Sequence, residues 1–233
     1  MKTLNLTAPT CWEDLTIRDL SFVVWLRAAC LSREERLVAA FCHFTHTKIR
    51  SVEDGTITLK LKKSPFWGDL GGLTIEELNS FLPQFAFILD ATPENIPNPT
   101  RINAHLMDTT FIQYFTADSL FLRYSLQGGR RYVRRAVSAL GWHPLWLSNT
   151  RCQMIVLWWN SVQRYMKEIY PNVYDDSGAG EICSPFKTHQ EIMLLLNDNH
   201  PQINASIDAS NVHAVLGALN QKISEIKRNE KHQ

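Results

Sequence analysis

Residues 149–171 read NTRCQMIVLWWNSVQRYMKEIYP, and this stretch predicts a long helix that is buried on more than one side. An asparagine or threonine at its start can cap the helix, and Pro171 ends it because a proline ring cannot continue a helix. Apolar residues recur every three or four positions, and the adjacent Trp158 and Trp159 each bring roughly 150–250 Å² of surface to bury. Such a helix needs several neighbours, so we expect it to be the centre of a helical domain.

The composition is that of an ordinary globular protein, with 45% hydrophobic and 20% charged residues in a chain of 233. Lys and Arg total 24 against 23 for Asp and Glu, so a nucleic acid or an anionic membrane would have to bind a local patch. Five widely spaced cysteines favour a reducing cytosol. The N-terminus lacks an apolar signal segment, and no apolar run approaches the roughly 18 residues of a membrane span. We expect a cytoplasmic protein with no membrane partner.

Helix starts are marked along the chain by a serine or threonine that is followed three residues later by an acid. This capping-box spacing occurs at Thr16, Ser32 and Thr74, each just before an apolar periodic segment. Asp108 is placed to cap a further helix over residues 111–127, which Gly128 and the next glycine would end. The sequence therefore predicts helices over most of its length.

One region changes to the alternation of a strand. Residues 48–52 and 56–62 are rich in β-branched side chains, and Gly55 between them suits a tight turn at positive φ, so we expect a β-hairpin near residues 48–62. The glycine-containing segment 68–72 that follows is interpreted as a loop. The predicted fold class is thus mainly α, of the α+β type. It consists of a helical domain around a central buried helix, a small β-hairpin and a C-terminal helical arm.

The polar, aperiodic tract DDSGAGEICS suggests where the chain divides. We predict a helical core domain with the hairpin over residues 1–174, a flexible linker over residues 175–184 and a C-terminal helical arm over residues 185–233. The segment 92–101, which holds three prolines, is interpreted as an extended crossing within the core domain because helices resume on both sides.

The arm carries an apolar seam of the kind that helices use to bind one another. Its members alternate by four and three positions as in a coiled coil, and they are Val212, Leu216, Leu219, Ile223 and Ile226. These are the predicted partner-binding residues, and the partner would be another protein or a second copy of the chain. The alternative is that the seam packs against its own domain.

A second surface candidate is a cluster of arginines on a predicted helix. Its members are spaced so that all lie on one side, with Tyr132 nearby to stack on a base, and they are Arg130, Arg131, Arg134 and Arg135. Such a stripe could neutralise phosphates, which makes nucleic-acid binding the alternative function. It could equally be the solvated face of an amphipathic helix.

Chemistry of other kinds has little support in the sequence. Cys42 and His46 stand four residues apart beside His43, as two metal ligands on a helix would, but the remaining ligands would have to come from afar, for example from His105. No hydrolase, metalloprotease, P-loop or dinucleotide motif occurs. We therefore predict no metal, no cofactor, no catalytic residue and no enzymatic activity; an enzyme with an unrecognised site is the second alternative.

Three segments together resemble a known group of proteins. They are LNLTAPTCWEDLTIRDLSFVVWLRAA at residues 4–29, VLWWNSVQRYMKEIYPNVY at residues 156–174 and LNQKISEIKRN at residues 219–229. In this order and spacing the chain resembles uncharacterised proteins of similar length that are encoded in bacterial prophage regions near tail genes. The resemblance implies a non-enzymatic accessory or assembly role, similar to that of tail assembly chaperones, with a phage structural protein as partner. It carries over no individual binding or catalytic residue.

Overall fold

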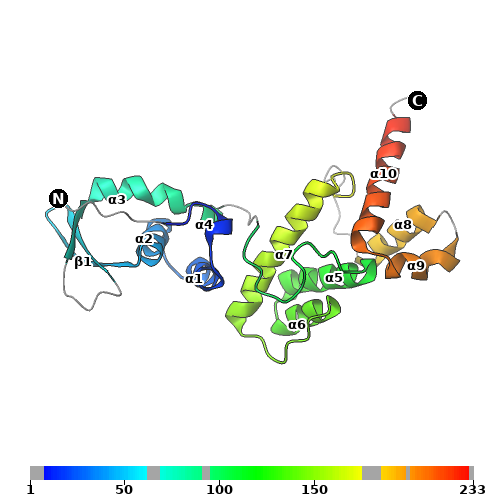
Figure 1. Cartoon of the computed structure of the whole chain (residues 1–233), viewed down its shortest axis with the longest axis horizontal. Coiled ribbons are helices and arrows are strands. Elements are labelled where there is room, and N and C mark those ends of the chain that lie inside the picture. Colours follow the sequence, from blue (N-terminus) through cyan, green and yellow to red (C-terminus); the bar gives the residue numbers. More distant parts are fainter. Residues whose placement is uncertain (1–7, 62–68, 91–94, 175–184, 198–199, 231–233) are drawn as a thin grey trace. The chain divides into compact units, whose positions relative to one another are not determined.

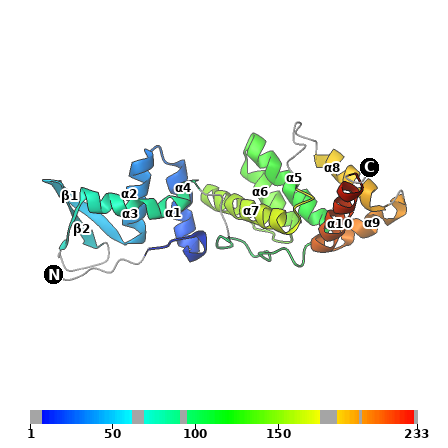
Figure 2. The same cartoon turned by 90° about the horizontal axis from the view of Figure 1, so that it is seen from above.

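A computed structural model describes residues 8–61, 69–90, 95–174, 185–197 and 200–230. Over these residues the protein is mainly helical and has one three-stranded antiparallel sheet, which confirms the predicted α+β class. Figures 1 and 2 show the arrangement of these elements.

The chain forms two compact units, residues 1–97 and residues 98–233. This differs from the predicted division, which placed residues 1–174 in one domain. The boundary falls within the proline-containing segment that was interpreted as an internal crossing. Apolar side chains are fully buried on both sides of it, so each unit has a core of its own. The predicted linker, residues 175–184, lies outside the described residues.

The first unit packs short helices beside the sheet. The predicted capping boxes at Thr16, Ser32 and Thr74 are confirmed, because each hydroxyl accepts a hydrogen bond from the backbone amide three residues later. Phe41 and Phe85 are buried in its core with ring centroids 6.2 Å apart. The helical elements are η1 (Trp12–Asp14), α1 (Ile17–Ala28), α2 (Arg33–Phe44), α3 (Ile75–Phe81), η2 (Leu82–Phe85) and α4 (Phe87–Asp90).

The predicted hairpin is present as β1 (Thr47–Glu53) and β2 (Thr56–Leu61), which pair antiparallel from Glu53–Thr56 outward. Asp54 and Gly55 form the turn with φ values of 47° and 74°, the left-handed region that a two-residue turn of this type requires.

A third strand, β3 (Asp69–Thr74), pairs with β2 in the segment that was expected to be a loop. That expectation was wrong, because glycines inside a strand also mark a close approach by a neighbour. A Cβ atom on Gly72 would collide with the Cγ2 methyl of Thr56 on β2. The glycine therefore allows the two strands to pair.

The first three helices of the second unit are α5 (Phe111–Gln127), α6 (Arg130–Ala139) and α7 (Asn149–Ile169). Gly128 and Gly129, at φ values of 67° and 96°, turn α5 back into α6, and the two helices lie side by side in Figure 1. Ser148 caps α7 by accepting a hydrogen bond from the backbone amide of Arg151 at 3.1 Å, and the helix ends at Ile169, two residues before Pro171. The elements are α5 (Phe111–Gln127), α6 (Arg130–Ala139), α7 (Asn149–Ile169), α8 (Pro185–Asn197), η4 (Pro201–Ile203), α9 (Asn204–Ala209) and α10 (Val212–Glu230).

Helix α7 is the buried hub that the sequence predicts for this unit. Trp158 is 2% exposed and Trp159 is 3% exposed, and both lie among other fully buried side chains of the same helix. Those side chains are Cys152, Met154, Ile155, Val162 and Met166. The buried side chains extend from Cys152 to Met166 at the spacing of three and four that an apolar helix face requires.

The C-terminal helices are part of the second unit. The backbone amide of Phe111 donates to Ser210 at 2.9 Å, and that of Val212 donates to Thr109 at 2.9 Å. The ring of His189 on α8 lies 6.0 Å from that of Phe111. Helices α8, α9 and α10 thus gather at the N-terminal end of α5 (Figures 1 and 2) and do not form a separate arm.

Candidate functional site

Arginines at the start of α6 line a surface hollow of about 240 Å³. Its walls are formed by Arg130, Arg131 and Arg134 from α6 together with Trp146 and Leu147 from the segment before α7. Of the four predicted arginines, Arg135 is also exposed but is not part of this wall. We call the five wall residues the arginine hollow.

One guanidinium group of the hollow is fixed by a neighbouring side chain. That of Arg131 lies over the ring of Tyr132, 4.8 Å from its centroid, and donates to the tyrosine hydroxyl at 3.0 Å. The hydroxyl in turn donates to Gln127 Oε1 at 2.7 Å. Tyr132 is only 9% exposed, so it orients Arg131 and does not offer its ring to a base, as the sequence had suggested.

The exposed aromatic face belongs to a residue that the sequence did not single out. Trp146 is 73% exposed, and its neighbour Leu145 is 97% exposed. Large apolar side chains in a connection between two helices are unusual, because such segments are normally polar. The sequence feature that could have identified Trp146 is therefore this pair of adjacent apolar residues in a connection that contains a proline. An indole beside three guanidinium groups gives the hollow both a stacking surface and positive charge.

The positive charge of the hollow is not neutralised by any carboxylate in the part of the chain that the structure describes. Among the described residues, none of the arginines at 130, 131, 134 and 135 forms an ion pair with a carboxylate. No side chain caps the N-terminus of α6, whose N-cap is Gly129, and arginines in a first turn oppose the helix dipole. Burial raises the pKa of the Cys152 thiol, while the charge of Arg130 acts in the opposite direction. An anion in the hollow would offset the repulsion among the arginines and between the arginines and the positive end of the helix dipole.

The predicted seam on α10 is largely used inside its own unit. Val212, Leu216 and Leu219 are 0%, 2% and 1% exposed, so they are not available to a partner in this structure. Ile223 is half-buried, and Ile226 is 40% exposed. The alternation by four and three is real, but the partner helices of the seam are α5 and α8 of the same chain.

Cys42 and His46, which were expected at helical spacing as metal ligands, do not lie on one helix. Helix α2 ends at Phe44, and His46 follows it in the left-handed region at φ 56°, so Cys42 and His46 do not share a helix face. His105 belongs to the second unit, where its ring lies 4.8 Å from that of Tyr165. Within the described ranges no three His, Cys, Asp or Glu side chains are grouped to hold a metal ion.

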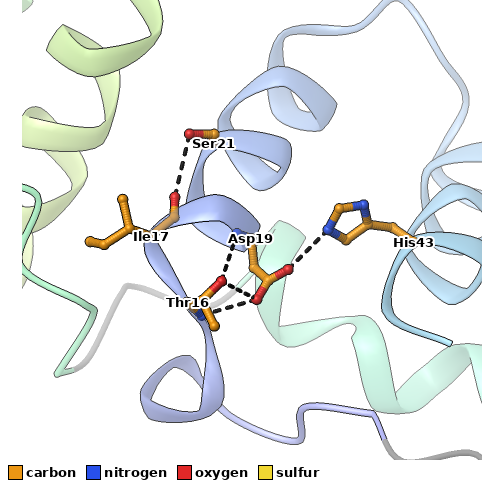
Figure 3. Close-up of polar contacts among 5 residues, drawn as sticks. All are labelled: Thr16, Ile17, Asp19, Ser21 and His43. Atoms are coloured by element: carbon orange, nitrogen blue, oxygen red, sulfur yellow. Dashed lines mark hydrogen bonds and ion pairs between the residues drawn. The ribbon is translucent and has the colours of Figure 1, made fainter. Parts of the chain in front are cut away.

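His43 instead joins α2 to α1 (Figure 3). Its Nε2 atom lies 3.0 Å from Asp19 Oδ1, and its ring stacks on Phe22 with centroids 3.7 Å apart. Thr16 donates its hydroxyl to the other carboxylate oxygen at 2.6 Å, and the Ser21 hydroxyl donates to the backbone of Ile17.

Burial raises the pKa of Asp19, but the hydrogen bonds from Thr16 and then the contact with His43 lower it more, so the net change is downward. The carboxylate therefore stays ionised and caps α1 while it holds His43. These contacts stabilise the packing of the two helices.

Comparisons with protein-family models, with curated proteins and with solved structures found no match to this chain. Within the described ranges, none of the helices combines the length and the apolar run that a membrane crossing requires.

Proposed function

We propose that this protein binds single-stranded nucleic acid through the arginine hollow. The observation that carries the proposal is that Arg130, Arg131 and Arg134 line one hollow with the exposed Trp146. Arginines bind phosphates, and an exposed indole stacks on an unpaired base irrespective of its identity. Paired bases offer no such face, so the hollow suits a single strand better than a duplex. The uncapped start of α6 adds backbone amides that favour a phosphate.

This proposal replaces the assembly role as the function with most support. The predicted protein partner was to bind the α10 seam, and the burial of Val212, Leu216 and Leu219 removes most of that surface. The phage-related origin and the assembly role stay predictions.

The test is fluorescence anisotropy with a labelled oligothymidylate of about twelve nucleotides. If about three phosphates are neutralised, the logarithm of the affinity should fall with the logarithm of salt concentration with a slope of about −2. Between about 50 and 200 mM salt this amounts to a loss of about 15-fold. Trp146→Ala should weaken binding by roughly 5- to 150-fold, the range of one stacked base.

The matched comparison is between two triple charge reversals. Arg130→Glu/Arg131→Glu/Arg134→Glu should lose at least about tenfold in affinity together with most of the salt dependence. The control reverses arginines that are exposed outside the hollow, at positions 18, 101 and 228, and changes the net charge equally. It should retain most of the affinity of the unmodified protein.

Two outcomes would overturn the proposal. One is an equal loss of affinity in both triple variants, which would show that only net charge matters. The other is equally tight binding of polyglutamate, which would show that the hollow binds any polyanion and does not distinguish nucleic acid.

A further inference from the structure

A second, separate pocket lies in the unit formed by residues 98–233. It has a volume of about 280 Å³, and its walls come from α5, α8, α10 and the residues that follow α7. Aromatic rings dominate one side, from Phe111, Tyr114, Phe115 and Tyr174, and aliphatic side chains of α8 and α10 form the other. At about 30 Å³ for each water molecule, this volume corresponds to about nine waters, which is enough for a small organic molecule.

The charged side chains among the described wall residues of this pocket are both acidic. They are Asp118 and Glu191. Asp118 forms no ion pair with any described residue. A carboxylate in apolar surroundings is unfavourable without a positive partner. The pocket therefore favours a cationic ligand over an anionic one.

A chain of hydrogen bonds fixes the carboxylate of Asp118 in place. Its Oδ1 atom accepts from Trp159 Nε1 at 3.2 Å and from Gln163 Nε2 at 2.6 Å. The side-chain oxygen of Gln163 accepts from the Tyr114 hydroxyl at 3.3 Å, which leaves that hydroxyl to accept from Tyr174 at 2.6 Å. Both donors to Asp118 use the same oxygen. Among the described residues its Oδ2 atom has no hydrogen-bond partner and remains available to a ligand.

The two tyrosines and the acid also affect one another. Burial is the main reason why the pKa of the Asp118 carboxyl is raised, and the hydrogen bond from Trp159 acts against it. Burial likewise raises the pKa of Tyr114, and nearby Tyr174 and Asp118 add to that effect. The phenols therefore remain neutral, and they present hydroxyls and ring faces to the pocket but no positive charge.

We propose that this pocket binds a small organic ammonium compound, with its cationic head at Asp118 and its apolar body between the aromatic rings and the α8 and α10 side chains. The ammonium group would donate to Oδ2 of Asp118 and face the rings of Tyr114 and Tyr174, which attract cations through their π electrons. The apolar body would be covered by Phe111 and Phe115. Carboxylate ligands would be repelled by the Asp118 carboxylate.

The test compares two probes of equal size by isothermal titration calorimetry on the full chain. 2-Phenylethylamine carries the ammonium group, and 2-phenylethanol is its neutral counterpart of the same shape. The unmodified protein should bind the amine at least about tenfold more tightly than the alcohol, because only the amine supplies the missing charge. Equal affinity for the two probes, or no binding of the amine, would refute the proposal.

Two variants test whether the probes bind in this pocket and whether Asp118 causes the preference for the amine. Asp118→Asn keeps an oxygen that can accept from Trp159 and Gln163, and it should bind both probes about equally, since the charge is gone. Ile223→Trp, on the α10 wall, should fill the pocket and abolish binding of both probes. A preference for the amine that persists in Asp118→Asn, or amine binding that survives in Ile223→Trp, would place the probe elsewhere and overturn the assignment.

Discussion

Replacing Trp158 by alanine is the sharpest test of α7 as the hub of the second unit. The indole is 2% exposed and belongs to a helix that buries six further side chains, so its removal leaves a cavity that rigid neighbours cannot refill. Truncation of a fully buried tryptophan costs about 3–5 kcal/mol in the free energy of unfolding. For a unit of this size we expect the unfolding temperature to fall by about 10–20 °C.

The assay is urea unfolding followed by far-UV circular dichroism, with calorimetry for the temperature. Trp146→Ala is the matched control, because it makes the same substitution in the same unit at a side chain that is 73% exposed. It should change the free energy of unfolding by no more than about 0.5 kcal/mol. A loss below about 1 kcal/mol in Trp158→Ala, or equal losses in the two variants, would refute the reasoning that burial makes α7 the hub.

Three further substitutions test local features of the fold. The Asp19 carboxylate, whose pKa is lowered on balance, stabilises the first unit above its ordinary pKa and loses that effect as the pH falls below about 4. Asp19→Asn should therefore be less stable by about 1 kcal/mol at pH 7, and the gap in urea unfolding should close toward about pH 2; a constant gap would contradict this sign. Gly72→Ala should cost about 1–3 kcal/mol because its methyl meets Thr56, and the Thr56→Ser/Gly72→Ala double variant should recover most of the loss in the same assay. Ser148→Ala should cost about 1 kcal/mol by removing the cap of α7, whereas Ser148→Asp should retain stability in thermal melts; similar losses in both would show that the cap is not responsible.

The candidate site was only partly predictable. The arginine cluster was visible because a helical spacing of four and one places the side chains on one side wherever the helix packs. The stacking residue, Trp146, was not visible in the sequence, because its exposure depends on which parts of the connection other elements cover. Tyr132 was therefore chosen over Trp146, although the structure buries the first and exposes the second.

The pocket around Asp118 gave no signal in the sequence. The polar groups hydrogen-bonded around Asp118 come from α5, from α7 and from Tyr174 beyond it, and residues 41 to 60 positions apart form these hydrogen bonds. Each residue alone fits an ordinary amphipathic pattern. Only the packing of these elements brings the carboxylate, the amide and the phenols together.

The sequence by itself determined the local features of this protein. A capping hydroxyl and its acid three residues on, the Asp54–Gly55 turn and the apolar period of α7 act within a few residues, so they do not depend on the rest of the chain. The tertiary structure alone decided what these elements pack against. It paired β3 with β2, divided the chain near Pro97 and turned the α10 seam inward, because each outcome depends on which distant apolar surface is available to be buried.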